Sequence, residues 1–210
     1  MELDPARTAL VVVDMVNWQV PKDVPEGAYW NQYYVDRCWE LVVPAHQRLL
    51  PAARAAGAKV VYLRVGATET DFSDVIRPFR EGFRMYDARI DTAACEVIPE
   101  IAPEPGDVTL EKRGSGGFNT AQLDACLRSL GVDTVIYTGV VTNCCVLLTV
   151  SAGFDMEYVG YLSADATASF SDELQAAAEL VMASMTATVT QTDDLVAALQ
   201  AAHSEVSAGV

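Results

Sequence analysis

The stretch DTVIYTGVVTNCCVLLT, residues 133–149, decides the fold class of this chain. Its first part is an apolar, β-branched run typical of a buried strand, and its last part has the composition of a helix. A strand that enters a helix through a tight turn is the repeating unit of α/β proteins. We therefore expect strands and helices to alternate along the rest of the chain.

The remaining sequence repeats this alternation. Besides the run at residues 134–138, short apolar runs predict strands at 9–13, 59–63, 108–110, 158–162 and 186–190. Helices are predicted at residues 42–56, 120–130, 143–152, 172–185 and 193–202. Strands that alternate with helices form parallel sheets covered on both faces. The sequence thus predicts a Rossmann-like, doubly wound fold of three layers, α/β/α, around a mostly parallel six-stranded sheet.

No internal repeat and no long linker rich in Pro, Gly or Ser interrupts the chain, so residues 1–210 are predicted to form one domain. Two stretches lack clear periodicity, residues 17–39 and 66–91, and they hold many of the aromatic residues and arginines. Long irregular segments in compact α/β domains are typically lids or subunit contacts. Ligands are expected outside the carboxyl ends of the strands, where the winding of the sheet changes direction.

The composition restricts the partners of the protein. The formal net charge is −15 and the isoelectric point is near 4.3, which disfavours nucleic acids and anionic membranes. The N-terminus has no export signal, and no apolar run approaches the roughly 20 residues of a membrane-spanning helix. The five cysteines form an odd set without CxxC spacing, which favours reduced thiols over disulfides or zinc. We expect a cytoplasmic protein that acts on a small molecule.

Two adjacent cysteines, Cys144 and Cys145, fall in the first turn of the helix that follows the strand at 134–138. Unpaired N–H groups and the positive end of the helix dipole lower the pKa of a thiol there and can hold a developing oxyanion. Thr142 or Asn143 is the expected N-cap of this helix. The alternative is that both cysteines are small buried residues that pack the helix on the sheet.

Two charged residues are predicted at the same edge of the sheet. Asp14 ends the apolar run TALVVVD, and Lys112 lies just beyond another short strand. Partial burial would raise the pKa of the carboxyl group toward the range of a general base, and the ammonium would orient it and lower the thiol pKa. The alternatives are a helix or turn cap for Asp14 and a solvated side chain for Lys112.

The glycine-rich loop GSGGFN does not predict a dinucleotide site, because Asn119 occupies the third glycine position of that motif and the preceding Lys and Arg are atypical. Asn119 and Thr120 are instead the expected cap of the following helix. The two histidines, His46 and His203, are interpreted as packing or surface residues. No cofactor is predicted.

Together these stretches resemble the isochorismatase-like cysteine hydrolases. The motifs KRGSGGFNT, TGVVTNCCV and GFDMEYVGYLSADAT follow VVVDM in the order of that family, over nearly the whole chain. The resemblance implies a catalytic triad of Asp14, Lys112 and Cys145. The family nucleophile directly precedes the residue matched by Val146, so the resemblance selects Cys145 as the nucleophile and leaves Cys144 as a packing neighbour.

The same resemblance describes the turn before the nucleophile and the chemistry. It implies a cis peptide between Val140 and Val141 and an oxyanion hole formed by the backbone N–H groups of Val141 and Cys145. The family includes nicotinamidases, carbamoylsarcosine amidases, and ureidoacrylate and biuret amidohydrolases. Isochorismatases proper lack the nucleophilic cysteine, so its presence implies cleavage of the C–N bond of a small amide, carbamoyl or ureido compound.

The sequence departs from the family pattern in three places. Nicotinamidases bind a metal through an Asp and two His after the second strand, but residues 62–79 contain no histidine, so no metal is predicted. Val16 replaces a Gln that commonly follows the catalytic Asp. The Glu and Arg-Asp that often follow the nucleophile are replaced by Leu147, Ser151 and Ala152. These differences prevent the transfer of a particular substrate from a relative.

The predicted substrate contacts are two aromatic residues and two arginines: Trp18, Phe118, Arg64 and Arg84. Arginine pairs bidentately with carboxylates, so Arg64, Arg77, Arg80 and Arg84 are candidates for a substrate carboxylate, with salt bridges as the alternative. The early aromatic residues line a pocket, pack in the core or contact a subunit: Trp18, Trp30, Tyr33 and Tyr34. The resemblance also implies a homo-oligomer, either a dimer or a tetramer.

Two other functions remain open from the sequence. A catalytically inactive binding protein would keep the fold and lose a triad member, whereas all three are present here. A redox-sensing thiol protein would use Cys144 and Cys145, but neighbouring cysteines at a helix start have poor geometry for a disulfide. Hydrolysis of a model amide distinguishes the enzyme from both alternatives.

Overall fold

The computed structural model describes residues 1, 3–24, 27 and 29–208 of the chain. Its strands form a six-stranded sheet in the order β3-β2-β1-β4-β5-β6, and each pair of neighbours is parallel. The strands span Thr8–Val13 (β1), Lys59–Val65 (β2), Val108–Lys112 (β3), Thr134–Val140 (β4), Val159–Ala168 (β5) and Thr188–Thr190 (β6). The predicted α/β fold class is confirmed, and the pairing is parallel throughout.

The central strand β1 shows why both faces of the sheet are covered. Its whole length is buried. Leu10 and Val12 belong to one apolar core, whereas Ala9, Val11 and Val13 belong to the other. Successive side chains of a strand point to opposite faces, so a continuous apolar run requires packing partners on both sides.

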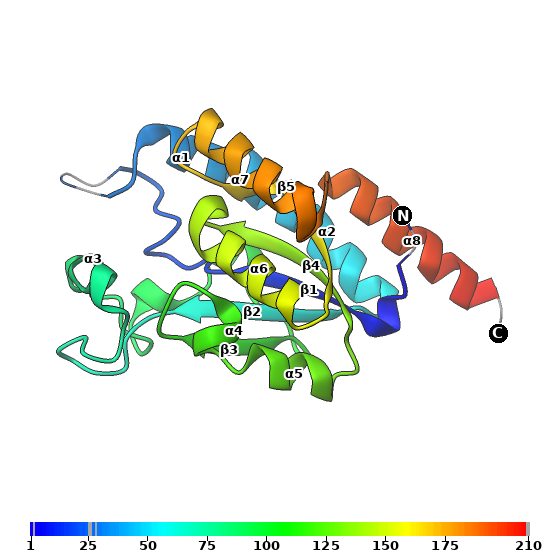
Figure 1. Cartoon of the computed structure of the whole chain (residues 1–210), viewed down its shortest axis with the longest axis horizontal. Coiled ribbons are helices and arrows are strands. Elements are labelled where there is room, and N and C mark those ends of the chain that lie inside the picture. Colours follow the sequence, from blue (N-terminus) through cyan, green and yellow to red (C-terminus); the bar gives the residue numbers. More distant parts are fainter. Residues whose placement is uncertain (2, 25–26, 28, 209–210) are drawn as a thin grey trace.

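Helices form the two outer layers (Figure 1). One face is covered by α2 (Val43–Ala56) and α8 (Thr192–Ala208), which pack against each other. The other face is covered by α5 (Leu123–Ser129), α6 (Leu147–Asp155) and α7 (Asp172–Met185). The short helices are α1 (Gln32–Arg37), α3 (Arg80–Met85) and α4 (Gly117–Thr120). Single helical turns span Pro5–Arg7, Cys38–Val42, Arg77–Phe79, Ala93–Cys95, Pro99–Ile101 and Thr142–Val146.

The helix expected at residues 120–130 is divided into α4 and α5, and the predicted cap is wrong. The N-cap of α5 is Gln122, which makes no capping hydrogen bond with its side chain. Thr120 lies inside α4, where its Oγ1 accepts from the Gly114 N–H at 3.1 Å and donates to the Gly116 carbonyl at 3.2 Å. This hydroxyl closes the glycine-rich loop and is therefore not available to α5.

Two strands are longer than their apolar runs. β3 ends at Lys112, so this lysine is the last residue of the strand and does not lie beyond it. β5 continues to Ala168 because, after a shift of register, Thr167 pairs with Gly139 and Ala168 pairs with Val140. Small and polar residues form this second part of β5, so the pattern of apolar residues did not predict that the strand continues there.

The strand order changes direction between β1 and β4, at the centre of the sheet. Parallel sheets of this kind bind ligands outside the carboxyl ends of the strands at such a point. The arrow of β2 in Figure 1 points toward the end of the molecule where α1 and α3 lie. In the described part of the chain, no helix combines the length and apolar character needed to cross a membrane.

Candidate active site

Asp14 is the first residue after β1, at the centre of the sheet. Its backbone has a φ of 53°, in the left-handed region that few residues other than glycine adopt. Its N–H still pairs with the neighbouring strand, donating to the Leu63 carbonyl at 3.0 Å. The side chain is completely buried. The strand β1 therefore holds a carboxyl group at the carboxyl ends of the sheet strands and away from water.

Lys112, the last residue of β3, supplies the charge that pairs with this carboxylate. Its Nζ lies 2.7 Å from Asp14 Oδ2, and both side chains are fully buried. Nζ also donates to the carbonyls of Gly114 at 2.7 Å and Ser115 at 2.8 Å. The ammonium thus has two hydrogen-bond acceptors and one ion-pair partner, which offset the cost of burying the charge.

Burial and pairing act in opposite directions on these two groups. Burial alone would lower the pKa of Lys112, but the negative charges of Asp14 and Cys145 raise it above its ordinary value, so the lysine is held as the cation. Burial raises the pKa of Asp14 well above its usual range, and Lys112 opposes that rise. A carboxylate with a raised pKa has a greater affinity for a proton, as a general base requires.

The two cysteines lie in the π-helical turn Thr142–Val146, which joins β4 to α6. Neither predicted cap residue caps the turn: Thr142 Oγ1 donates to Gln175 Oε1 at 2.8 Å, and Asn143 Oδ1 accepts from the Ser169 hydroxyl at 2.7 Å. Both side chains instead connect the turn to the segment that follows β5. The expectation of a side-chain N-cap at this helix start is therefore wrong.

Cys145 is buried next to Asp14, whereas Cys144 is half-buried and lies closer to the glycine-rich loop. The Cys145 thiol and the Asp14 carboxyl group lie close enough to raise or lower each other's pKa, although neither carboxyl oxygen has a hydrogen-bond partner among the described residues. Cys144 Sγ donates to Ser115 Oγ across 3.7 Å. The cysteines also hydrogen-bond to each other, and this bond, with support from Ser115 and Lys112, lowers the pKa of Cys144 to about 6. The same bond, together with burial, raises the pKa of Cys145.

The end of β4 shapes the floor beneath these sulfur atoms. Gly139 has a φ of +99°, and a Cβ atom at this position would lie 2.0 Å from the Val13 carbonyl oxygen. Only glycine allows β4 to approach β1 so closely. The peptide between Val140 and Val141 is cis. Val141 and Cys145, the two residues expected to form an oxyanion hole, both line the cavity described next.

A cavity of about 530 Å³ opens above this edge of the sheet. Its floor holds Gly114, Ser115, Val141, Cys144 and Cys145. Most of its remaining surface is aromatic, and we define the aromatic wall as Trp18, Tyr29, Trp30, Phe79, Phe83, Tyr86 and Phe170. The volume is in the range of typical small-molecule sites, which is about 300–1,000 Å³.

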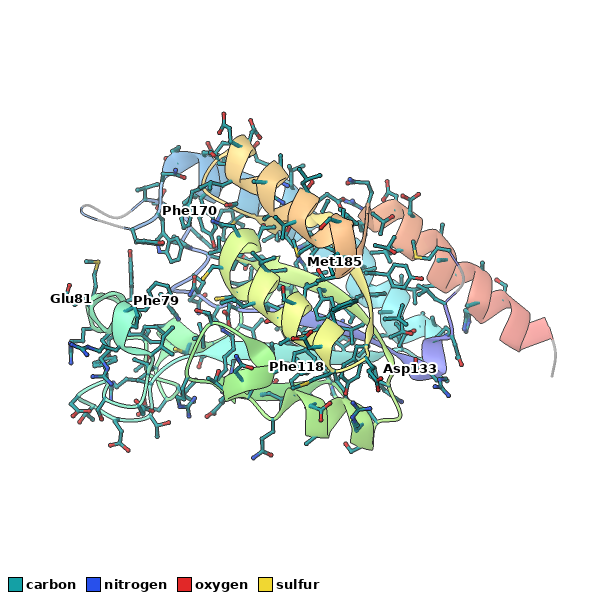
Figure 2. The ribbon with its side chains drawn as sticks, viewed as in Figure 1. Phe79, Glu81, Phe118, Asp133, Phe170 and Met185 are labelled. Carbon is teal, nitrogen blue, oxygen red and sulfur yellow. The ribbon has the colours of Figure 1, made fainter. Side chains whose placement is uncertain are left out.

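The irregular stretches supply most of the aromatic wall, whose rings pack against one another. The Trp18 ring centroid lies 5.0 Å from that of Phe83 and 5.7 Å from that of Tyr86. Trp30 stacks on Phe170 at 5.9 Å, and Tyr29 meets Phe170 edge-on at 5.2 Å. Figure 2 shows Phe79 and Phe170 at the same end of the molecule, approaching from the α3 side and from the segment before α7.

Comparisons with known proteins agree with this geometry. Residues 8–194 match the isochorismatase domain. The chain belongs to the isochorismatase family. It is 31% identical to the ureidoacrylate amidohydrolase RutB of Stutzerimonas stutzeri over 177 residues, which covers 77% of this chain and 70% of that protein.

Two solved structures extend the comparison. A cysteine hydrolase from Pseudomonas syringae pv. phaseolicola has a TM-score of 0.84 and 31% identity, with 96% of each chain covered. The N-carbamoylsarcosine amidase of Thermoplasma acidophilum has a TM-score of 0.71 and 28% identity, covering 89% of this chain and 97% of that one. The fold is thus shared over almost the whole length with isochorismatase-family hydrolases.

Of the four substrate contacts predicted from the sequence, the cavity of this isochorismatase-family protein includes Trp18. Phe118 packs against Tyr158 at 5.5 Å within the core beneath α5 and α6 (Figure 2). Arg64 pairs with Glu111 at 3.4 Å, and Arg84 donates to the Asp71 carbonyl at 2.8 Å. Because these three side chains have other partners and do not line the cavity, we no longer assign them substrate contacts.

Several cavity residues of this isochorismatase-family chain were not predicted. Gln19 is buried in the cavity lining, and among the described residues its Oε1 has no hydrogen-bond partner. Phe79 and Phe83 lie in the irregular stretch 66–91, whose aromatic content was the only signal for them, and Phe170 lies outside both irregular stretches and had no signal. Val16, which replaces the Gln of the family pattern, is buried in the core and pairs with Val97.

Among the described residues, no histidine lines this cavity. His46 is buried between α2 and β4, where Nδ1 lies 2.7 Å from the Val42 carbonyl and Nε2 lies 2.9 Å from Thr138 Oγ1. It is a packing residue, and His203 is exposed on α8. No three His, Cys, Asp or Glu side chains of the described residues gather as a metal site.

Proposed function

We propose that this protein hydrolyses the C–N bond of a small amide, carbamoyl or ureido compound through a thioester on Cys145. The observation that carries the proposal is the buried Lys112–Asp14 ion pair next to Cys145, whose thiol lines the floor of a cavity large enough for a small molecule. The names of the relatives give the same reaction class, because ureidoacrylate amidohydrolase and N-carbamoylsarcosine amidase both name C–N hydrolases.

In the first half-reaction, Asp14 removes the proton of the Cys145 thiol while Sγ attacks the carbonyl carbon of the substrate. The S–C bond forms, and the carbonyl electron pair moves onto oxygen. When the tetrahedral intermediate collapses, the C–N bond breaks and Asp14 returns its proton to the departing nitrogen. Ammonia or an amine leaves, and the acyl group remains on sulfur.

In the second half-reaction, water attacks the thioester and gives one proton to Asp14. Collapse of the new intermediate breaks the C–S bond, releases the carboxylic or carbamic acid, and returns the proton to Cys145. Atoms balance as substrate plus water giving acid plus ammonia or amine. No metal or cofactor takes part in this proposal.

Lys112 and the backbone have distinct roles in these steps. Lys112 is a positioning residue that keeps Asp14 ionised in the resting protein and fixes its orientation through the contact at 2.7 Å. The backbone N–H groups of Val141 and Cys145 are assigned to the oxyanion. Each such donor contributes on the order of 3 kcal/mol to lowering the barrier.

The test is a pair of adjacent substitutions, Cys145→Ala and Cys144→Ala, assayed by ammonia release from a panel of amides, ureas and carbamoyl acids. We expect Cys145→Ala to lower turnover by at least about 1,000-fold and Cys144→Ala to lower it by less than about tenfold. Substitution is needed because the lowered pKa of Cys144 makes that thiol the first target of alkylating reagents.

Activity that is lost in Cys144→Ala and kept in Cys145→Ala would assign the nucleophile to Cys144, and full activity in both variants would exclude a thioester.

The two other functions that the sequence left open have their own outcomes. An inactive binding protein releases no ammonia from any substrate, and a redox sensor responds reversibly to peroxide without hydrolysis. We also place the protein in the cytoplasm as a homo-oligomer with no nucleic-acid or membrane partner, which cell fractionation and light scattering test.

A further inference from the structure

The cavity beside Cys145 lacks the charges that a carboxylated substrate needs. Among the described residues that line it, none carries a formal charge apart from what the two thiols can develop. We propose, on the basis of the hydrolase function proposed above, that the substrate is a neutral amide whose acyl side carries an apolar group of aromatic-ring size or larger. The aromatic wall holds that group, and the amide carbon lies over Cys145.

Three arginines near the cavity are occupied by other partners. Arg80 donates to the Ser73 and Val75 carbonyls, and Arg84 donates to the Asp71 carbonyl and covers the ring of Phe72. Arg113 pairs with Asp74 at 3.2 Å and Glu111 at 3.0 Å. These three guanidinium groups are held by protein oxygens, and Arg77 is exposed and does not line the cavity, so none of the four is presented to the cavity as a fork for a substrate carboxylate.

The aromatic wall presents flat apolar surface on the side of the cavity that faces away from the sheet. Trp18 is oriented by its Nε1, which donates to the Val65 carbonyl at 3.1 Å, so its ring contributes area and no free donor. Phe83 packs on this ring, and Phe170 packs on Trp30. Rings favour offset and edge-on contacts with other aromatic groups, which suits a planar apolar substituent.

Polar groups in the lining lie where an amide group would be held. Ser115 Oγ accepts from Cys144 Sγ and lies beside the glycine-rich loop that also binds Lys112. Gln19 has a buried Oε1 with no partner among the described residues, an acceptor suited to the N–H of a primary amide after a small side-chain rotation. Two residues of the aromatic wall also have buried polar atoms without partners among the described residues, Trp30 Nε1 and the Tyr86 hydroxyl. The cavity thus combines uncharged polar groups with ring surface, as a neutral aromatic or arylalkyl amide requires.

Two matched compounds test the class of ligand without depending on turnover. Phenylacetamide carries a neutral ring, and 4-carboxyphenylacetamide adds one carboxylate to the same ring. Binding of each to the Cys145→Ala variant is measured by quenching of tryptophan fluorescence, since Trp18 and Trp30 line the cavity. We expect the neutral compound to bind at least about 100-fold more tightly, because an unpaired carboxylate loses its hydration beside apolar rings.

Turnover of the unmodified protein is measured with the same pair and with N-carbamoylglycine, a small carboxylated ureide. We expect kcat/KM for phenylacetamide to exceed both other values by at least about 100-fold. A larger value for N-carbamoylglycine, or a binding ratio near one, overturns the inference and leaves the cysteine hydrolase intact. Absence of hydrolysis together with the expected binding ratio instead refutes the proposed reaction and keeps the ligand class.

A charge added to the aromatic wall provides the matched variants. Phe79 is 41% exposed and lines the cavity, whereas Phe154 on α6 is 43% exposed and does not line it. Phe79→Arg is expected to raise affinity for 4-carboxyphenylacetamide about tenfold and to lower that for phenylacetamide. Phe154→Arg is expected to change neither, and an equal response of both variants contradicts the placement of the ligand ring.

Discussion

The sheet edge and the aromatic wall meet at one cavity but are built in different ways. We use sheet edge for Asp14, Lys112 and Gly139, which lie at the carboxyl ends of β1, β3 and β4. Each of these residues is fixed by strand pairing, burial or a contact that allows no other side chain. The residues of the aromatic wall come from irregular segments and the turns beside α3, and several are partly exposed.

This difference indicates which residues of the site can be substituted without loss of the fold. At the sheet edge, geometry and chemistry depend on the same atoms, because the residues that hold the strands together also carry the ion pair. In the aromatic wall, ring area can be altered while the strands stay in place. We therefore expect substitutions at the edge to cost stability and substitutions in the wall to change substrate preference.

The largest expected effect compares a glycine of the sheet edge with a glycine of α3, the helix that holds Phe83 of the aromatic wall. Gly139→Ala places a Cβ atom 2.0 Å from the Val13 carbonyl oxygen at a φ of +99°, so β1 and β4 must separate. The free energy of unfolding should fall by at least about 4 kcal/mol. A Cβ atom at Gly82 in α3 would have no other atom within 4 Å, so Gly82→Ala should change the free energy of unfolding by less than about 1 kcal/mol.

Urea unfolding of both glycine variants measures this difference. A loss below about 1 kcal/mol for Gly139→Ala would mean that the strand ends are as adaptable as the wall, which would refute the comparison.

The second effect compares two lysines that form ion pairs in different surroundings. Lys112→Met removes the partner of a carboxylate that is completely buried, whereas Lys22→Met removes one from an exposed pair with Glu100. Breaking a buried pair typically costs about 3–5 kcal/mol, and protonation of Asp14 reduces the cost, so we expect about 3 kcal/mol for Lys112→Met. Loss of an exposed pair costs less than about 1 kcal/mol.

Chemical denaturation and the amide assay together check the lysine pair. Equal losses of stability in Lys112→Met and Lys22→Met would show that burial does not strengthen the contribution of the Lys112–Asp14 pair to the free energy of unfolding. Full activity of Lys112→Met would contradict its positioning role.

The sequence predicted the sheet edge better than the wall for a physical reason. Asp14 directly follows one apolar run and Lys112 lies two residues beyond another, and parallel strands bring their carboxyl ends to the same side of a sheet, so the position of each follows from local sequence. The turn that holds Cys145 follows β4 in the same way, although the caps of the turn were wrong because Thr142 and Asn143 bond to distant residues.

The wall could not be derived in this way. Phe170 and Gln19 reach the cavity from loops and Phe83 from the short helix α3, and the placement of these segments depends on long-range contacts that no short-range pattern encodes. Arg64 and Arg84 were predicted to bind a substrate carboxylate because of their charge. In the structure, Arg64 pairs with a carboxylate of the protein and Arg84 donates to a backbone carbonyl. Only the aromatic density of the irregular stretches indicated a pocket, and it did not identify the residues that line it.

The smallest effect concerns His46, which supports β4 next to the sheet edge by bonding to Thr138, the residue before Gly139. Burial lowers the pKa of His46 from 6.5 to about 4. Between pH 4 and 6.5, His46 binds a proton in the unfolded chain but not in the folded protein. The contribution of His46 to the free energy of unfolding is therefore fully present above pH 6.5 and is lost as the pH falls toward 4. Between pH 7.5 and 5 the loss should be about 2 kcal/mol.

The effect is isolated by urea unfolding of the unmodified protein and of His46→Gln at both pH values, because the many carboxyl groups contribute equally to the two proteins. The variant should be less stable at pH 7.5, since the buried hydrogen bonds to Val42 and Thr138 are altered, but its stability should fall less on acidification. Identical dependence of stability on pH in the two proteins would show that burial of His46 does not lower its pKa.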